Sequence, residues 1–401
     1  MKINNLYYKL QKQSFYIILI TMRYLNELFN VNKREDRSLK FKLNANIKRK
    51  IFTFDTKGKR LDSSFLSYLF DLTNTFFSKY NLSWYILNIN LHTMRFADKN
   101  VYMLLDLLVY YIIKEGKFLV IVSVEPEYSD GSVSTSIGFE NTAIYQLSGM
   151  NVSLKNYENY KSYKNNFIEF YEKKLNASEN WFRKFLTREI LDNSITVSKV
   201  TTDVSSFLKN IGIAQETTFA INDTVSEIMS NTEHNDGDCL LDINVHGKYI
   251  YISFINLFNA RLFDKLKIMH KNYTLTKGAS EILNKAYKYH KEQFSEYYVE
   301  DDFYFISAFQ SNITTKNSLS GGTGLTTAFN ALSKQTLIRE SYVLSGNNII
   351  IFKSGLLGNN KKVIGFNKNN DYYTGIPDKE LINRCELYIP GVVIQLGLEL
   401  V

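Results

Sequence analysis

Residues 217–235, TTFAINDTVSEIMSNTEHN, are the most informative segment of the C-terminal half. Their apolar spacing predicts a helix whose buried face is formed by Ile221, Val225, Ile228, Met229 and Thr232. Glu227, Asn231 and His234 lie four and seven residues apart, which puts them on one stripe beside that face, where they could converge on a ligand. Taken alone, such a stripe is usually the solvated side of an amphipathic helix.

The segments that follow change this interpretation. Leu240–Val245 and Tyr249–Phe258 have the pattern of two strands, and the short segment between them has hairpin spacing. Further along, residues 320–327 read SGGTGLTT and precede a predicted helix over Thr326–Lys334. Glycine backbone and a helix N-terminus can cradle phosphate. The segment is not a Walker A loop, because Lys and Ser or Thr do not close it.

This order of helix, hairpin, variable segment and glycine loop resembles the GHKL (Bergerat-fold, histidine kinase-like) ATPases, which include gyrase-type topoisomerases, heat-shock chaperones, histidine kinases and mismatch-repair ATPases. The resemblance covers residues 200–401. It implies an α/β sandwich with a mixed, largely antiparallel sheet and helices on one face. It also implies that Glu227 is the general base, that Asn231 binds Mg²⁺ and that His234 matches a histidine of the anti-sigma and histidine kinase branches. The triphosphate would be contacted by the glycine loop, at Gly321, Gly322, Thr323 and Gly324.

The chemistry of nucleotide hydrolysis asks for the same residue types. Mg²⁺ prefers oxygen donors and keeps several waters, so the amide oxygen of Asn231 is an adequate protein ligand beside phosphate oxygens. A carboxylate one helical turn earlier, Glu227, can orient a water for attack on the γ-phosphate. The alternative for Glu227 is an ordinary surface acid, and for His234 an ordinary histidine at a helix end.

One element departs from the family pattern. The second strand of the hairpin should end in Asp-x-Gly-x-Gly, and Asn256, Phe258 and Ala260 occupy those places. In the family the Asp accepts a hydrogen bond from the adenine amino group. Asn256 could substitute through its amide oxygen, with less charge assistance. Phe258 indicates either a reshaped base pocket or a core residue of the strand, and the second reading is the commoner one for a lone aromatic.

Residues 261–319 lie where the family has its ATP lid, and they contain a predicted helix over Ala279–Ser295 with its own packing face. The acidic run over residues 300–302 is interpreted as a solvated turn. Near the C-terminus, strands are predicted over Tyr342–Ser345, Ile349–Lys353 and Val392–Leu398. A Gly-Asn-Asn turn is expected between the first two, and a turn at Pro390-Gly391 before the third.

The N-terminal half contains a predicted β-α-β unit with strands over Trp84–Asn90 and Phe118–Val124 and a helix over Asp98–Lys114, which implies parallel pairing. Residues 45–125 resemble the STAS domain of anti-anti-sigma factors. In place of its phosphorylated Ser or Thr, residues 96–100 read FADKN. A generic α/β packing domain is the alternative. Residues 1–44 are expected to be a helical segment and residues 126–199 a connecting, partly helical region, with a polar helical stretch over 154–176.

Composition and charge bound the class of protein. The 401 residues, 45% hydrophobic and 22% charged, are ordinary for a globular chain and exclude full-length disorder. A net charge of +8 is a mild bias toward anionic partners. Cys239 and Cys385 can build neither a disulfide framework nor a multi-cysteine zinc site, which favours a cytoplasmic location. The apolar run Phe15–Met22 is too short to cross a bilayer, and no membrane partner is expected.

The leading functional hypothesis is a magnesium-dependent, ATP-binding regulatory protein that uses binding or hydrolysis to switch its own N-terminal domain or a protein partner. Anti-sigma-type Ser/Thr kinase activity is its narrower form, and homodimerisation is left open. The alternative is a non-catalytic interaction scaffold with a degenerate nucleotide site. Nucleic-acid binding ranks last. It is suggested by the net charge, by the basic clusters Lys48–Lys50 and Lys57–Arg60, and by the number of aromatic residues, but most aromatic residues are expected to belong to the core.

Overall fold

The computed structural model divides the chain into two compact units, Met1–Lys174 with Glu386–Tyr388, and Leu175–Cys385 with Ile389–Val401. The described residues are 42–46, 51–55, 66–67, 69, 85–92, 99–114, 118–124, 142–146, 157–174, 180–187, 194–233, 237–258, 260–313, 324–353, 355–356 and 363–401. The predicted helical segment over residues 1–44 lies outside them, except that residues 42–44 begin a strand.

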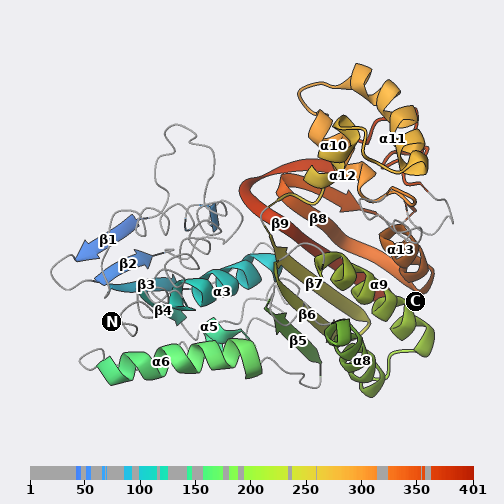
Figure 1. Cartoon of the computed structure of the whole chain (residues 1–401). Helices are drawn as coiled ribbons and strands as arrows, with labels where there is room; N and C mark the ends of the chain where they lie inside the picture. The colour runs from blue at the N-terminus through green and yellow to red at the C-terminus, as the bar shows by residue number, and fades with distance from the viewer. Residues whose placement is uncertain are drawn as a thin grey trace, which may run out of the picture. The chain divides into compact units, whose positions relative to one another are not determined.

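The first unit contains a four-stranded sheet in the order β1 (Lys42–Asn46), β2 (Ile51–Asp55), β3 (Tyr85–His92) and β4 (Phe118–Val124). β1 and β2 are antiparallel, whereas β2 with β3 and β3 with β4 are parallel. Helix α3 (Lys99–Lys114) connects β3 to β4 (Figure 1). The predicted β-α-β unit with parallel pairing is therefore confirmed.

Helices pack around α3 in the same unit. The buried Asp106 carboxylate in α3 accepts a hydrogen bond from the backbone N–H of Ile144, at the start of the short helix α5 (Ala143–Gln146). Helix α6 (Tyr157–Glu169) continues into a π-helical turn, η2 (Phe170–Lys174). Tyr171 in that turn stacks on Tyr110 of α3 with ring centroids 4.4 Å apart. Of the polar stretch predicted over residues 154–176, the described part, 157–174, is thus helical and contacts α3 through an aromatic side chain.

The second unit is a sandwich of helices on a five-stranded sheet. The sheet order is β5 (Trp181–Leu186), β6 (Asp238–His246), β7 (Tyr249–Leu257), β9 (Ile382–Leu400) and β8 (Thr336–Phe352), and every neighbouring pair is antiparallel. Helices α8 (Ser194–Asn210), α9 (Gln215–Glu233) and α13 (Gly324–Gln335) form the helix layer (Figure 1). The expected α/β class with an antiparallel-rich sheet is confirmed.

The alternation of side chains along the strands explains why the helices form a layer on one face of this sheet. In β6, Cys239, Leu241 and Ile243 are fully buried and share one core with residues of the helices, such as Val204 of α8 and Val225 of α9. Residues two apart on a strand face the same side of a sheet, so these three form one apolar face. Burying that face against amphipathic helices is what builds the two layers.

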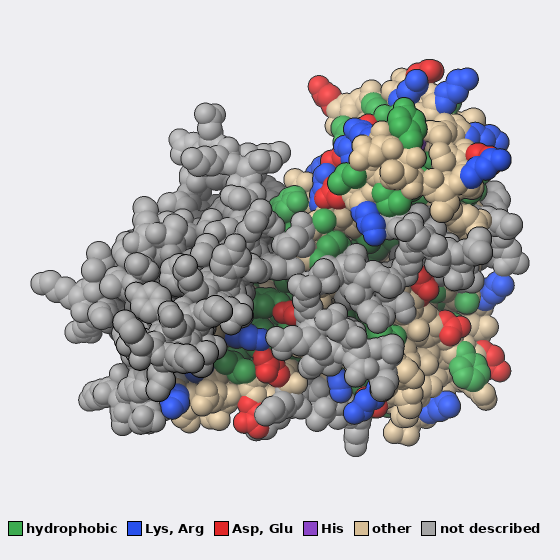
Figure 2. All heavy atoms as spheres, in the orientation of Figure 1, with side chains coloured by type: hydrophobic (Ala, Val, Ile, Leu, Met, Phe, Trp, Pro, Cys, Tyr) green, Lys and Arg blue, Asp and Glu red, His purple; other side chains and the backbone are tan. Residues whose placement is uncertain are grey.

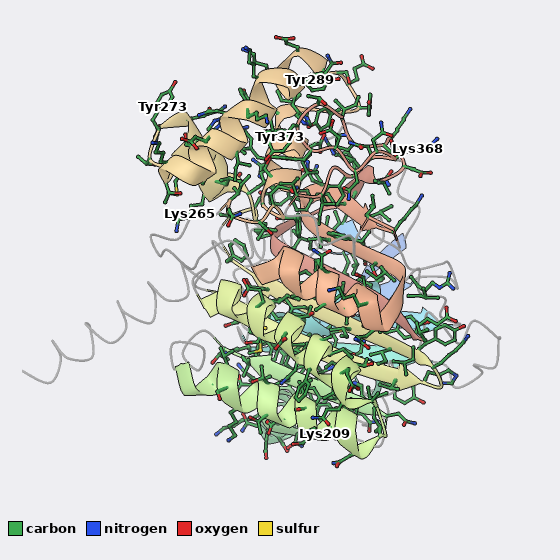
Figure 3. The ribbon with its side chains drawn as sticks, turned by 90° about the vertical axis from the view of Figure 1, so that its right-hand side faces the viewer. Lys209, Lys265, Tyr273, Tyr289, Lys368 and Tyr373 are labelled. Atoms are coloured by element: carbon green, nitrogen blue, oxygen red, sulfur yellow. The ribbon has the colours of Figure 1, made fainter. Side chains whose placement is uncertain are left out.

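A helical insertion over residues 261–313 follows β7. It contains α10 (Asp264–Lys271), α11 (Lys277–His290), the short helix η3 (Lys291–Gln293) and α12 (Glu300–Ser307). The predicted helix over Ala279–Ser295 corresponds to α11 and η3. Figure 3 shows Lys265 and Tyr273 at the outer side of this insertion, while Tyr373 comes to it from the connection between β8 and β9.

In the connection between β8 and β9, the described residues 363–381 pack on the insertion through buried hydrogen bonds. The side-chain amide of Gln310 bonds the backbone of Ile364 in both directions, at 3.0 Å and 2.7 Å. The Tyr372 hydroxyl lies 2.7 Å from Ser307 Oγ, and the Tyr372 carbonyl accepts a hydrogen bond from His290 Nε2 at 2.8 Å. The insertion and the connection therefore share one core.

Two predicted turns near the C-terminus are wrong. The Gly-Asn-Asn segment lies inside the single strand β8, because the residues on both sides of it pair with β9, Leu344 with Val393 and Asn348 with Arg384. The register shifts on both sides of Gly346, where the extra residues lie in β9 and are absorbed as an irregularity of the ladder. Gly391 likewise lies within β9 and faces Leu257 of β7.

Candidate functional site

Helix α9 carries the predicted stripe. Ile221, Val225, Ile228 and Met229 are 3% exposed or less, which confirms the predicted buried face at these four positions. Glu227 lies beside that face and is half-buried. Asn231 lies one turn later in the same helix. The side chains of Asn231 and Thr232, and the whole of His234, lie outside the described residues.

The topology brings the last turns of α9 to one end of the sheet. Four residues separate the end of α9 at Glu233 from the start of β6 at Asp238, which pairs with Leu257, the last residue of β7. Leu257 in turn pairs with Gly391 of β9. We call the end of the sheet formed by Asp238, Leu257 and Gly391 the β7 exit end. Because the connection is so short, the C-terminal turns of α9 lie at this end.

The glycine segment precedes a helix that starts toward the same end. Gly324 is the first residue of α13, two residues before the predicted start, and Gly321, Gly322 and Thr323 lie outside the described residues. α13 leads directly into β8, whose first residue, Thr336, pairs with Leu400 at the opposite end of the sheet. A 12-residue helix is about 18 Å long, so α13, packed along α9, begins back toward the β7 exit end (Figure 1).

Asn256 is a fully buried amide at the β7 exit end. Its Nδ2 donates a hydrogen bond to the backbone carbonyl of Asp238 at 3.0 Å, and a carbonyl can only accept, so the amide orientation is determined. Its Oδ1 is buried and has no hydrogen-bond partner. An unmatched buried acceptor costs on the order of 1–3 kcal/mol. The oxygen is therefore a candidate acceptor for a ligand N–H group.

Backbone packs closely around this amide. A Cβ on Gly391 would lie 2.1 Å from the main-chain oxygen of Asn256, and one on Gly237 would lie 3.0 Å from Asn256 Nδ2. Phe258 is 5% exposed and belongs to the shared core. The interpretation of Phe258 as a core residue is thus correct, because its side chain is packed in the core and shielded from solvent.

The acidic run Glu300, Asp301 and Asp302 is the first turn of α12, and its interpretation as a solvated turn is wrong. Asp302 is 1% exposed and binds the Arg384 guanidinium of β9 at 2.6 Å and Asn348 Nδ2 of β8 at 2.9 Å. Asp301 binds Arg261 and Lys267. The run thus joins the insertion to the strands beside it, and Figure 2 shows acidic and basic side chains intermingled over this region.

These contacts change the acidity of the carboxylates. Burial raises the pKa of Glu300, but hydrogen bonds from Lys267, Lys271 and the Tyr287 hydroxyl outweigh it and lower that pKa to about 2. Burial also acts to raise the pKa of Asp301, and hydrogen bonds from Lys267 and Arg261 again lower it. Both carboxylates are therefore charged at neutral pH and serve as anchors.

Sequence reasoning missed the residues that hold the end of β7. Ser345 of β8 accepts a hydrogen bond from the backbone N–H of Leu262 at 2.8 Å and donates one to the carbonyl of Gly391 at 2.6 Å. Arg261 forms a bridge with Gly391. These partners are 46 or more residues apart in the chain, so no local spacing could have indicated them.

Comparisons of the chain with protein-family models, with curated proteins and with solved structures found no significant match. Within the described residues, no helix has the length and apolarity to cross a membrane. The same part of the chain holds no group of three or more His, Cys, Asp or Glu side chains placed to bind a metal ion.

Proposed function

We propose that the second unit binds ATP with Mg²⁺ at the β7 exit end and uses binding or hydrolysis to switch the N-terminal domain or a partner protein. The observation that carries this proposal is the buried, unpartnered Oδ1 of Asn256. It lies at the end of the sheet to which the topology brings the last turns of α9 and the start of α13. The resemblance to GHKL ATPases in the order of these elements supports the same assignment.

Asn256 fits an adenine base. Since its Nδ2 is engaged by Asp238, the amide can only accept a further hydrogen bond through Oδ1. Adenine carries an amino group that donates, whereas guanine presents a carbonyl oxygen at the equivalent position. An acceptor therefore favours adenine. The neutral amide makes this bond weaker than the carboxylate that the family pattern would supply.

The remaining roles follow the family resemblance. Asn231 would hold Mg²⁺ together with phosphate oxygens, and the ion supplies charge neutralisation on those phosphates. Residues Gly321, Gly322, Thr323 and Gly324 would approach the phosphates through backbone N–H groups at the start of α13. Glu227 would take the proton from an attacking water or hydroxyl. His234 would lie on the same side of α9.

The narrower proposal is transfer of the γ-phosphate to a Ser or Thr hydroxyl of a protein partner, as in anti-sigma-type kinases. It predicts labelled phosphate on a co-purified partner and loss of that label in Glu227→Gln. Turnover without a labelled protein would support hydrolysis alone.

Calorimetric titration with a slowly hydrolysed ATP analogue, with and without Mg²⁺, tests the site. We expect binding that Asn256→Leu weakens about 10-fold or more, because the variant leaves the adenine amino group unpaired. Asn231→Ala should remove the Mg²⁺ dependence. Asn222→Leu is the matched control: its Oδ1 is also buried without a partner, but it lies nine residues before Asn231, about 180° around α9. Equal binding by wild type and Asn256→Leu would contradict the proposal.

A scaffold with a degenerate nucleotide site is the second candidate function. The observation that favours it is Phe258, whose ring fills the core at a position where the family pattern has glycine. Absence of binding by the folded wild-type protein in the same titration would exclude ATP binding and favour this alternative.

A further inference from the structure

Arg261 connects the end of β7 to the helical insertion. Its Nε and Nη2 donate to Asp264 Oδ1 at 2.9 Å and 2.7 Å, and its Nη1 donates to Asp301 Oδ2 at 2.5 Å. Asp264 is only three residues away and belongs to the same local turn. Asp301, 40 residues further along, is the contact that joins this turn to α12.

The backbone of the same turn contacts the strand that packs on Asn256. The Gly391 N–H donates to the Ala260 carbonyl at 2.8 Å, and Gly391 bridges Arg261. Gly391 also packs against the main chain of residues 256–258, where an added Cβ would lie within 3.0 Å of three of their atoms. A displacement of Arg261 would therefore displace Gly391, and Gly391 would in turn displace the main chain that carries the Asn256 amide.

Asp301 is itself held on both oxygens. Lys267 of α10 donates to its Oδ1 at 2.7 Å, while Arg261 takes Oδ2. Both partners are about a quarter exposed or less, so the carboxylate bridges two elements at the rim of the insertion. Asparagine at this position offers one acceptor instead of two and turns its amide hydrogens toward a cation.

We propose that Asp301 is a positioning residue for the base-binding site: by holding Arg261, the insertion sets the place of the Asn256 acceptor and thereby the preference for adenine over guanine. This inference rests on the proposed nucleotide site. The insertion would then affect nucleotide selectivity through the contact between Asp301 and Arg261, neither of which binds the nucleotide.

The test is the ratio of affinities for slowly hydrolysed ATP and GTP analogues, measured by calorimetry on the full chain with Mg²⁺. We expect Asp301→Asn to lower the ATP-to-GTP preference by about 3- to 10-fold, the range of one misplaced hydrogen bond. Arg261→Lys, which keeps the charge but cannot hold both Asp264 and Asp301 with a fork, should lower it as well. A purely structural role would weaken both analogues equally.

Glu300→Gln is the matched control. It removes ion pairs with Lys267 and Lys271 in the same turn of α12 but none with Arg261. It should lower the melting temperature and leave the affinity ratio within twofold of wild type. Two results overturn the inference separately: wild type that binds neither analogue removes it together with the nucleotide site, whereas an unchanged ratio in both folded Asp301→Asn and Arg261→Lys removes it while nucleotide binding stands.

Discussion

At the scale of single residues, Gly391 and Asn256 are adjacent where β7 and β9 pair. Gly391 has a φ of +112°, a conformation that residues with a Cβ rarely adopt, and a Cβ there would also meet the Asn256 main-chain oxygen. The backbone strain and the steric clash would both arise from adding a Cβ at Gly391. The glycine therefore permits the close approach that buries the Asn256 amide.

Gly391→Ala is expected to destabilise the second unit by about 2–4 kcal/mol, because backbone strain and a steric clash add. Chemical denaturation monitored by circular dichroism measures the change. Gly247→Ala is the control: Gly247 has a φ of +57° in the hairpin turn and open space around its Cβ position, so only strain of about 1 kcal/mol is expected. Equal losses in the two variants would show that the contact with Asn256 has no energetic effect.

At the scale of elements, the first turn of α12 joins the insertion to the sheet. Asp302 accepts a hydrogen bond from the Val299 N–H at 2.9 Å, and it also binds Asn348 of β8 and Arg384 of β9. One carboxylate thus begins the helix and attaches it to two strands. A negative charge in a first helical turn is also favourable to the helix dipole.

Asp302→Asn should lower the free energy of unfolding by about 2–3 kcal/mol, because a buried charged acceptor is lost while Arg384 keeps partial access to water. Urea denaturation measures it. Glu380→Gln removes the ion pair with Lys353, whose two side chains are 50% and 66% exposed, and should leave the urea midpoint unchanged. A midpoint for Asp302→Asn equal to wild type would mean that the insertion is held by its apolar core alone.

Elements were predictable where their pattern is local. The buried face of α9 and the β6–β7 hairpin follow from residues within 40 positions of one another, and Leu241 and Ile243 already show the alternation. The prediction of a solvated turn at the start of α12 is wrong, because Asp302 binds Arg384 at a separation of 82 residues. Periodicity describes which side of an element is apolar and contains no information on distant charged partners.

At the scale of the whole molecule, stability should depend on pH in two steps. His290 is fully buried between Tyr298 and the Tyr372 carbonyl, and burial lowers its pKa below the ordinary 6.5, outweighing the hydrogen bond to Tyr372 and the charge of Asp371. The unfolded chain then binds a proton that the folded chain excludes, so stability falls as pH falls below 6.5. The lowered pKa values of Glu300 and Asp301 add a second loss as pH falls below about 4.5.

Urea midpoints measured from pH 8 to pH 4 check both steps. Between pH 6.5 and 5 we expect a loss of up to about 1.4 kcal/mol per pH unit from His290. His290→Gln, whose amide can serve the same two partners without titrating, should be flat across that interval and retain the loss at lower pH. A wild-type midpoint that does not change between pH 7.5 and 5 would contradict the assignment.

Local patterns in the sequence were enough to predict helix α9 (Gln215–Glu233), the hairpin after it, the parallel β-α-β unit and the α/β class, because apolar periods of 3.6 and 2 residues reflect which faces must be buried. The assignment of Asn256 to a nucleotide base rests on the family resemblance and stays a prediction. The folded structure was needed to show that Asn256 Oδ1 is buried without a partner, that β8 continues past its Gly-Asn-Asn segment, and that Asp301 binds Arg261. The reason is that hydrogen bonds, strand registers and ion pairs join residues far apart in the chain, and their formation depends on the packing of the whole unit.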